Sequence, residues 1–172
     1  RAEPRPPPER LDGIAALVDG VPIFRSVLAR RCAPVLALRR AEKPLSSLEE
    51  MKLGREVLEQ MIDETLIAVD AGRIGIVATE AELAAAIAMV KQMSGIDAAQ
   101  LEAEVARSGL SFLEYEDLLR QQILEQKWII YHTSGMDTYL FADAAGFNEA
   151  YAAERRRLVS GLRERSFIEV RW

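Results

Sequence analysis

Apolar residues form short strand-like runs near the two ends of the chain and recur at helical spacing between them. Near the start, Ile14–Val18 and Val21–Phe24 flank Asp19-Gly20, a pair that favours a two-residue hairpin turn. The other run is residues 166–172, at the end of the sequence. A lone hairpin is marginally stable in water, and an edge strand leaves backbone groups unpaired. We therefore predict that the last strand pairs with the first hairpin in a small antiparallel sheet that joins the two ends.

The residues between these strands are predicted to be almost entirely helical, so the expected fold class is mainly α. A hydroxyl residue followed three positions later by glutamate forms a capping box, which begins a helix. This pattern occurs at Ser47 with Glu50, Thr79 with Glu82, and Ser111 with Glu114. Together with the apolar spacing, it predicts helices over residues 26–40, from 47 to Gly72 or Gly75, and over residues 79–95, 97–107, 112–131 and 147–165.

Three further residue types refine these boundaries. Ser26 and Asp97 are expected to be the N-caps of the first and fourth helices, because their side chains accept hydrogen bonds from free backbone N–H groups. Pro34 is expected to kink or interrupt the first helix, since proline lacks a backbone N–H. Residues 41–47, which include Pro44, are predicted to be a linker.

Length and composition favour a single domain. With 172 residues and a hydrophobic fraction of 49%, the chain can bury a sizeable core. Residues 1–11 are rich in proline and are predicted to be a disordered leader, with one domain over residues 12–172. A start of this kind is expected of a chain whose signal peptide or anchor has been removed. No apolar run approaches the roughly 20 residues that a membrane-spanning helix needs.

Charge is segregated along the chain. Residues 1–45 carry a net charge of +4, residues 46–150 carry −12, and residues 151–172 carry +3, which together give the total of −5. The preferred interpretation is that basic end elements pack beside an acidic helical block. Nucleic-acid binding is the weaker alternative, because Arg155-Arg156-Arg157 is the only dense basic cluster and no aromatic residues accompany it.

Catalytic and metal-binding chemistry finds little support. Cys32 is the only cysteine and lies among apolar residues, so we expect a small core residue rather than a reactive thiol. His132 is the only histidine, and at a predicted helix end it is expected to cap the last carbonyl groups. Without a second histidine or cysteine there is no zinc-type ligand set, and no glycine-rich phosphate loop is present. We therefore expect no metal, no ATP, no other cofactor and no enzymatic activity.

The order of these elements resembles the N-terminal domain of the SurA-type periplasmic chaperones. The resemblance covers about residues 12–131 and 147–172. It is carried by Val18–Ile23, Leu58–Leu66, Gly75–Leu83 and Ser108–Tyr115, and by Leu162–Arg171, which is similar to the closing helix and strand of that family. Members of the family carry one or two parvulin-like isomerase domains between the long capped helix and the closing helix. Here that position holds only a short loop, residues 134–146. The resemblance therefore implies the chaperone core without prolyl isomerase activity.

The resemblance implies an ATP-independent periplasmic holdase whose clients are unfolded exported proteins, in particular outer-membrane barrel precursors. A pliable apolar groove is the expected client site, because flexible methionine side chains adapt to varied partners. Candidate contacts for the client are Met51, Met61, Met89, Met93, Phe112, Tyr115 and Trp128. At helical spacing these residues also suit ordinary core packing, which is the default interpretation.

Two other classes of function remain open. The chain could be an interaction module that docks one fixed, folded partner, or it could be a residual prolyl isomerase. A homodimer formed by exchange of the terminal strand and the first hairpin is also compatible with the sequence, because a swap reforms the same contacts between two copies. A monomer is equally compatible.

Overall fold

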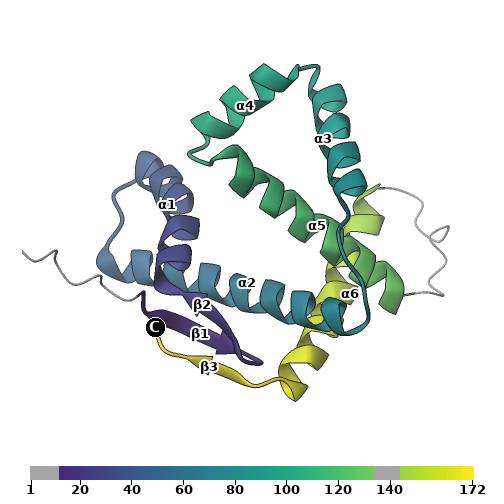
Figure 1. The fold of residues 1–172 in the computed structure, drawn as a ribbon. Helices are drawn as coiled ribbons and strands as arrows, with labels where there is room; N and C mark the ends of the chain where they lie inside the picture. Colours follow the sequence, from purple (N-terminus) through teal and green to yellow (C-terminus); the bar gives the residue numbers. More distant parts are fainter. Residues whose placement is uncertain (1–11, 134–143) are drawn as a thin grey trace, which may run out of the picture.

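The computed structural model describes residues 12–133 and 144–172, which form two strands, six helices and a third strand (Figure 1). Their bounds are β1 (Ile14–Val18), β2 (Val21–Phe24), α1 (Arg25–Glu42), α2 (Ser47–Arg73), α3 (Glu80–Ser94), α4 (Ala98–Arg107), α5 (Phe112–His132), α6 (Ala144–Arg165) and β3 (Ile168–Val170). The prediction of a mainly helical fold is confirmed. Among the described residues, no helix is both long and apolar enough to cross a membrane.

The three strands form one antiparallel sheet in the order β2-β1-β3. The last strand therefore pairs with the first hairpin, as the sequence predicts. Asp19 occupies the turn with a φ of 48°, and it joins the two ends of the chain directly. Its backbone N–H donates to the carbonyl of Phe167 at 2.8 Å, and its carboxylate accepts from the N–H of Phe167 at 2.8 Å.

Three of the predicted N-caps are confirmed. Thr79, Asp97 and Ser111 each accept a hydrogen bond from the backbone N–H three residues later, and the side chain at that position bonds back to the cap. The box predicted at Ser47 and Glu50 is wrong by one residue, because Ser46 and Glu49 form it. Both pairs have the required spacing, so the sequence alone does not choose between them.

The first helix differs from the prediction in two ways. Ser26 is not its N-cap, because α1 begins at Arg25, and the N–H and hydroxyl of Ser26 bond instead to the carboxylate of Asp12. Pro34 does not interrupt α1, which runs from Arg25 to Glu42 and shortens the predicted linker. Proline removes one hydrogen bond of the helix, and α1 stays continuous where it packs along α2.

Two further predictions involve residues outside the described part. The leader over residues 1–11 lies outside it, as do residues 134–143 of the predicted loop. The remainder of that loop is helical, because α6 begins at Ala144, three residues before its predicted start at Phe147.

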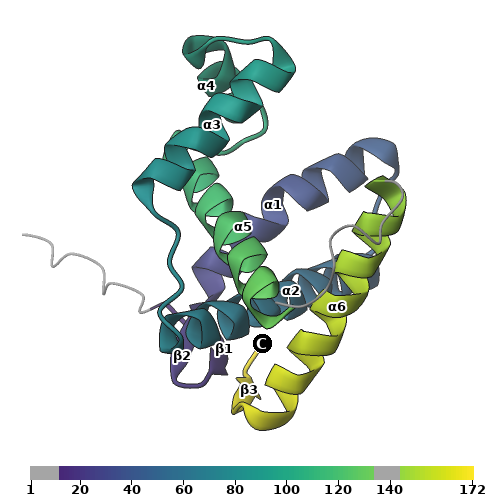
Figure 2. The same ribbon diagram turned by 90° about the vertical axis from the view of Figure 1, so that its right-hand side faces the viewer.

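The core is built around α2, which lies between the sheet and the other helices (Figures 1 and 2). The fully buried side chains of Leu58, Ile62 and Leu66 from α2 meet Trp128 of α5 and Leu162 of α6. A second buried group, Leu83, Leu101, Val105 and Leu119, holds α3, α4 and the start of α5 together as a lobe that projects from this body (Figure 2). Cys32 is buried in the main core, as predicted.

Candidate functional site

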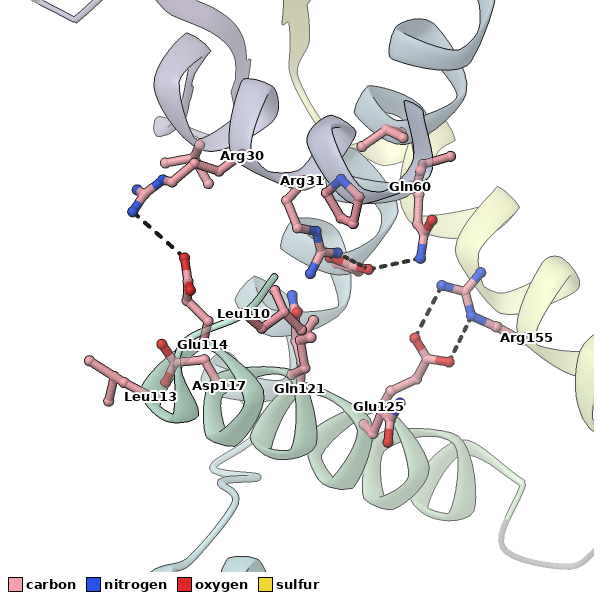
Figure 3. A pocket seen from close by; sticks show the side chains of 17 residues that line it. Arg30, Arg31, Gln60, Leu110, Leu113, Glu114, Asp117, Gln121, Glu125 and Arg155 are labelled. Atoms are coloured by element: carbon pink, nitrogen blue, oxygen red, sulfur yellow. Dashed lines mark hydrogen bonds and ion pairs between the residues drawn. The ribbon is translucent and has the colours of Figure 1, made fainter. Parts of the chain in front are cut away.

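A groove with a volume of about 740 Å³ lies between α1 and α5. Figure 3 shows α1 and α5 on opposite sides of this space, with α2 behind and α6 at one end. Helices α1 and α5 both pack on α2. The groove separates α1, which belongs to the main body, from the start of α5, which belongs to the projecting lobe. A cavity of this size is within the range of sites that bind small ligands or short peptide segments.

The α1 wall is one face of the helix. Four of its lining residues lie three, four, seven and eight positions after Val27, and this spacing places all five in a single stripe. They are Val27, Arg30, Arg31, Pro34 and Val35. Two valines and a proline make this wall largely apolar, and the two arginines reach from it toward α2 and α5 (Figure 3).

The α5 wall is also one face of its helix, and it is longer than the α1 wall. It begins at Leu110, just before the helix, and extends along the helix to the level of Arg155 on α6. The stripe contains two leucines among five polar or charged side chains, and it consists of Leu113, Glu114, Asp117, Leu118, Gln121, Gln122 and Glu125. The floor is supplied by Val57, Gln60 and Glu64 of α2. The groove therefore presents apolar surface together with amide and charged groups.

Charged side chains in the groove are largely paired with one another. Arg31 donates two hydrogen bonds to the Glu64 carboxylate, at 2.7 and 2.5 Å, and the Gln60 amide donates to the same carboxylate at 3.2 Å. At the α6 end, Arg155 donates two bonds to Glu125, at 2.8 and 3.1 Å. The hydrogen bonds that Arg155 donates to Glu125 are the main reason that the pKa of Arg155 is raised. A groove whose charges are already satisfied favours an uncharged occupant.

One ion pair crosses the groove. The guanidinium of Arg30 on α1 lies 3.9 Å from the carboxylate of Glu114 on α5 (Figure 3). Both side chains are exposed, so the pair contributes little stability in water. Glu114 belongs to the capping box of α5, and the hydrogen bond from the backbone of Ser111 is the main cause of its lowered pKa. This bridge therefore links the two walls loosely.

The groove has no arrangement typical of a reaction centre. Within residues 12–133 and 144–172, no group of three histidine, cysteine, aspartate or glutamate side chains is placed to hold a metal ion. His132 lies elsewhere, where its ring packs edge-on against Trp128 at 4.9 Å and its Nε2 lies 3.3 Å from Oδ2 of Asp70. Its predicted role as a cap for the last carbonyls is wrong, because the Thr133 hydroxyl donates to the carbonyl of Ile129 instead.

None of the seven residues predicted to contact a client lines this groove. Met61 and Trp128 are in the core, with exposed fractions of 8% and 0%, so their side chains are not available to a client in this structure. Trp128 is buried because its indole N–H donates to Asp70 at 2.9 Å, which allows the whole ring to leave water. The remaining five lie at the surface or close to it.

The five accessible candidates form three separate groups. Met89 and Met93 are exposed on α3, and Met51 is exposed on α2. Phe112 and Tyr115 are half-buried on α5, with their ring centroids 5.9 Å apart. Client contact by these five residues stays a prediction.

Sequence reasoning missed the groove because its walls look like ordinary solvated helix faces. Charged residues recur with apolar ones at helical spacing on α1 and on α5, but nothing in either stripe shows that the two face each other. The segregation of charge was a partial guide. Basic residues from the ends do pair with the acidic middle, as Arg31 does with Glu64, Arg155 with Glu125, and Arg163 with Asp63 at 2.5 Å.

The fold is a helical domain with a groove between α1 and α5, and its first hairpin and last strand are joined in a small sheet. Residues 8–129 match the model of the SurA-like N-terminal domain, and the chain belongs to this family. It is 32% identical over 123 residues to Chaperone SurA of Bordetella pertussis, which covers 71% of this chain and 23% of that protein.

Two further relatives give the same result. Chaperone SurA of Bordetella avium is 33% identical over 141 residues, with 76% of this chain and 27% of the relative covered. Chaperone SurA of Cupriavidus pinatubonensis is 35% identical over 114 residues, with 66% and 22% covered. This chain thus spans about a quarter of the length of these relatives.

Proposed function

We propose that this chain is an ATP-independent periplasmic holdase that binds unfolded segments of exported proteins, outer-membrane proteins among them, and that it has no prolyl isomerase activity. Its relatives are named chaperones, which supports the general role. The groove between α1 and α5 supports the binding mode, and we assign the client segment to it.

The observation that carries the proposal is the combination of apolar side chains with charges that are already paired. A client segment that enters the groove covers Val27, Val35 and Leu118 and gains from the removal of apolar surface from water. The Gln121 and Gln122 amides offer donors and acceptors to its backbone. Because these contacts depend little on one side-chain sequence, they suit many clients rather than one.

The groove is open, and this favours release. Leu113 on its rim is 64% exposed, so an occupant stays partly in contact with water. Only part of its apolar surface is buried, and binding also costs the ordering of a flexible chain. We expect affinities in the micromolar range (about −8 kcal/mol), which allow a client to leave without ATP.

Exposed methionines extend the proposed client surface beyond the groove. Met89 and Met93 are 59% and 79% exposed on the projecting lobe, and Met51 is 58% exposed on α2. Their flexible thioether side chains adapt to different partners. We propose that they contact longer clients, with the groove as the primary site.

The experiment that tests the proposal is light scattering of a denatured outer-membrane barrel protein diluted into buffer. With this chain present at near-equal molar amount, we expect scattering to be suppressed without ATP. If scattering is unchanged and the chain instead forms one tight, saturable complex with a folded protein, the proposal is wrong and the chain is a dedicated interaction module. A prolyl-peptide turnover assay with the same protein is expected to show no rate above the uncatalysed reaction.

A further inference from the structure

The two free edges of the sheet differ in what they offer to another strand. On β2, Pro22 lies at a position whose backbone points away from β1, and proline has no N–H to donate. Helix α1 then begins directly after Phe24. These features protect the β2 edge from pairing.

The β3 edge lacks such protection. Ala16 pairs with Val170 and Val18 with Ile168, while Asp19 N–H bonds to Phe167 O and Arg171 N–H to Ala15 O. In an antiparallel ladder this register directs the N–H and C=O groups of Ile168 and Val170 away from β1. Among the described residues, no intramolecular hydrogen bond uses these four groups. β3 is the outer strand on this side of the sheet (Figure 1).

The side chains along this edge are largely apolar. Phe167, Val170 and Trp172 are 61%, 47% and 49% exposed. The two charged side chains, Glu169 and Arg171, bond to each other at 2.8 and 2.9 Å, so the edge presents no unpaired charge. The ring of Trp172 rests on α2, where a Cβ added to Gly54 would lie 2.9 Å from it. Trp172 therefore widens the apolar surface beside the edge.

We propose that β3 is a second binding site, which takes an extended, apolar, uncharged peptide segment as a fourth strand of the sheet. The outward backbone groups of Ile168 and Val170 can be satisfied together only by another extended backbone, which selects a strand. The three exposed side chains offer on the order of 300 Å². A stable dimer buries about 800 Å² per partner, so a transient peptide fits this edge better than a second copy.

This inference rests on the proposed function, because the occupant is a segment of an unfolded client. It adds a site that binds the backbone of the client rather than particular side chains. This site lies on the edge of the sheet, away from the α1–α5 groove. A client that engages both sites at once gains affinity through the high effective concentration of its second segment.

Backbone amide exchange in the unmodified chain tests the inference. The probe is a seven-residue peptide of alternating threonine and valine with blocked ends, and its control carries proline at the central position. With the probe, we expect exchange at Ile168 and Val170 to slow by about fivefold or more, as one net hydrogen bond predicts. Exchange at Glu169, which already pairs with Leu17, stays unchanged. The proline control has a smaller effect.

Two variants provide an independent test. V170P removes an outward N–H without removing a β1–β3 hydrogen bond, and V170T is the matched control that keeps the N–H. We expect V170P to weaken binding of the probe about tenfold and V170T to change it less than twofold. If V170P does not fold, as judged by its near-ultraviolet circular dichroism, the exchange measurement on the unmodified chain decides.

Three outcomes overturn the inference. Probe binding without slower exchange at Ile168 and Val170 places the peptide elsewhere, and slower exchange confined to groove residues leaves the groove proposal standing alone. Protection at Ile168 and Val170 that increases with protein concentration without peptide identifies a second copy as the occupant. Holdase activity that is retained in groove variants, with the edge protection unchanged, contradicts only the assignment of the client to the groove.

Discussion

The indole N–H of Trp128 on α5 donates to Oδ2 of Asp70 on α2 at 2.9 Å, inside the core. The other carboxylate oxygen of Asp70 accepts from Arg165 of α6 at 3.4 Å. Asp70 is the one buried charged residue of the described chain, with 8% of its surface exposed. One carboxylate thus links three helices of the main body, α2, α5 and α6.

Removal of this carboxylate is expected to destabilise the body. D70A leaves the Trp128 N–H buried without a partner and removes the partner of Arg165, so we expect a loss of about 3 kcal/mol. W128F removes only the donor and part of the ring, and we expect about 2 kcal/mol. Urea unfolding followed by far-ultraviolet circular dichroism measures both. A change below 0.5 kcal/mol for D70A (about the scatter of surface substitutions) would contradict the assigned link.

Asp19 is expected to stabilise the junction between the two chain ends. Its carboxylate accepts from Phe167 N–H at 2.8 Å and from Arg73 at 3.1 Å, and its φ of 48° is unfavourable for most residues. D19A loses these bonds and retains the strain, so we expect a loss of about 2 kcal/mol. D19G, which relieves the strain, and D19N, which suits this conformation, separate the two effects in the same unfolding measurement. If D19A and D19G are equally stable, the strain argument is wrong.

The free energy of unfolding is expected to depend on pH through the ion pair between Glu82 and Lys127. The hydrogen bond from Lys127 and those from Thr79 lower the pKa of Glu82 to about 2, from an ordinary value of 4.5. A lowered folded-state pKa contributes stability above the unfolded value, and this contribution is lost as pH falls toward the folded value. E82Q keeps the capping box but removes the charge.

We therefore expect wild type to be more stable than E82Q above about pH 5. This difference should close as the pH falls from 4.5 to about 2. Urea midpoints measured between pH 2 and 7 give the difference at each pH. A difference that is constant over this range would exclude Glu82 as its origin.

The balance of charge in the groove is expected to determine how tightly acidic peptides bind compared with neutral ones. E64Q leaves the Arg31 guanidinium without its carboxylate partner in the groove floor. We expect affinity for an acidic peptide to rise about threefold or more, since a new partner for Arg31 is available. E59Q is the matched control, because Glu59 pairs with Arg163 outside the groove. Fluorescence anisotropy with labelled acidic and neutral peptides gives the ratio, and an equal increase for both variants would contradict the assignment.

Local sequence patterns were sufficient to predict most of the fold. The hairpin at Asp19-Gly20 and the boxes at Thr79 and Ser111 depend on neighbours within three residues, and all are confirmed. Predictions failed where a distant residue competes. Ser26 donates its N–H and hydroxyl to Asp12, 14 positions earlier, instead of accepting a backbone hydrogen bond as an N-cap does.

The groove could not be predicted, because it depends on the placement of whole helices. The residues of α1 and α5 that face each other are over 80 positions apart in pairs such as Arg30 and Glu114, and both helices pack on α2. Each stripe alone has the composition of a solvated surface. Only the packing of both helices on α2 creates the space between them.

Substitution of Leu113 tests the central claim most directly. Leu113 lines the groove and is 64% exposed, whereas Leu48 is 60% exposed and does not line it. We would measure the affinity of a labelled barrel-protein peptide for wild type, L113K and L48K by fluorescence anisotropy. Equal residue type and similar exposure mean that stability changes little in either variant. We expect L113K to weaken binding about tenfold, since it places an unpaired charge in the groove, and L48K to change it less than twofold. Equal affinities of L113K and L48K would show that clients bind elsewhere.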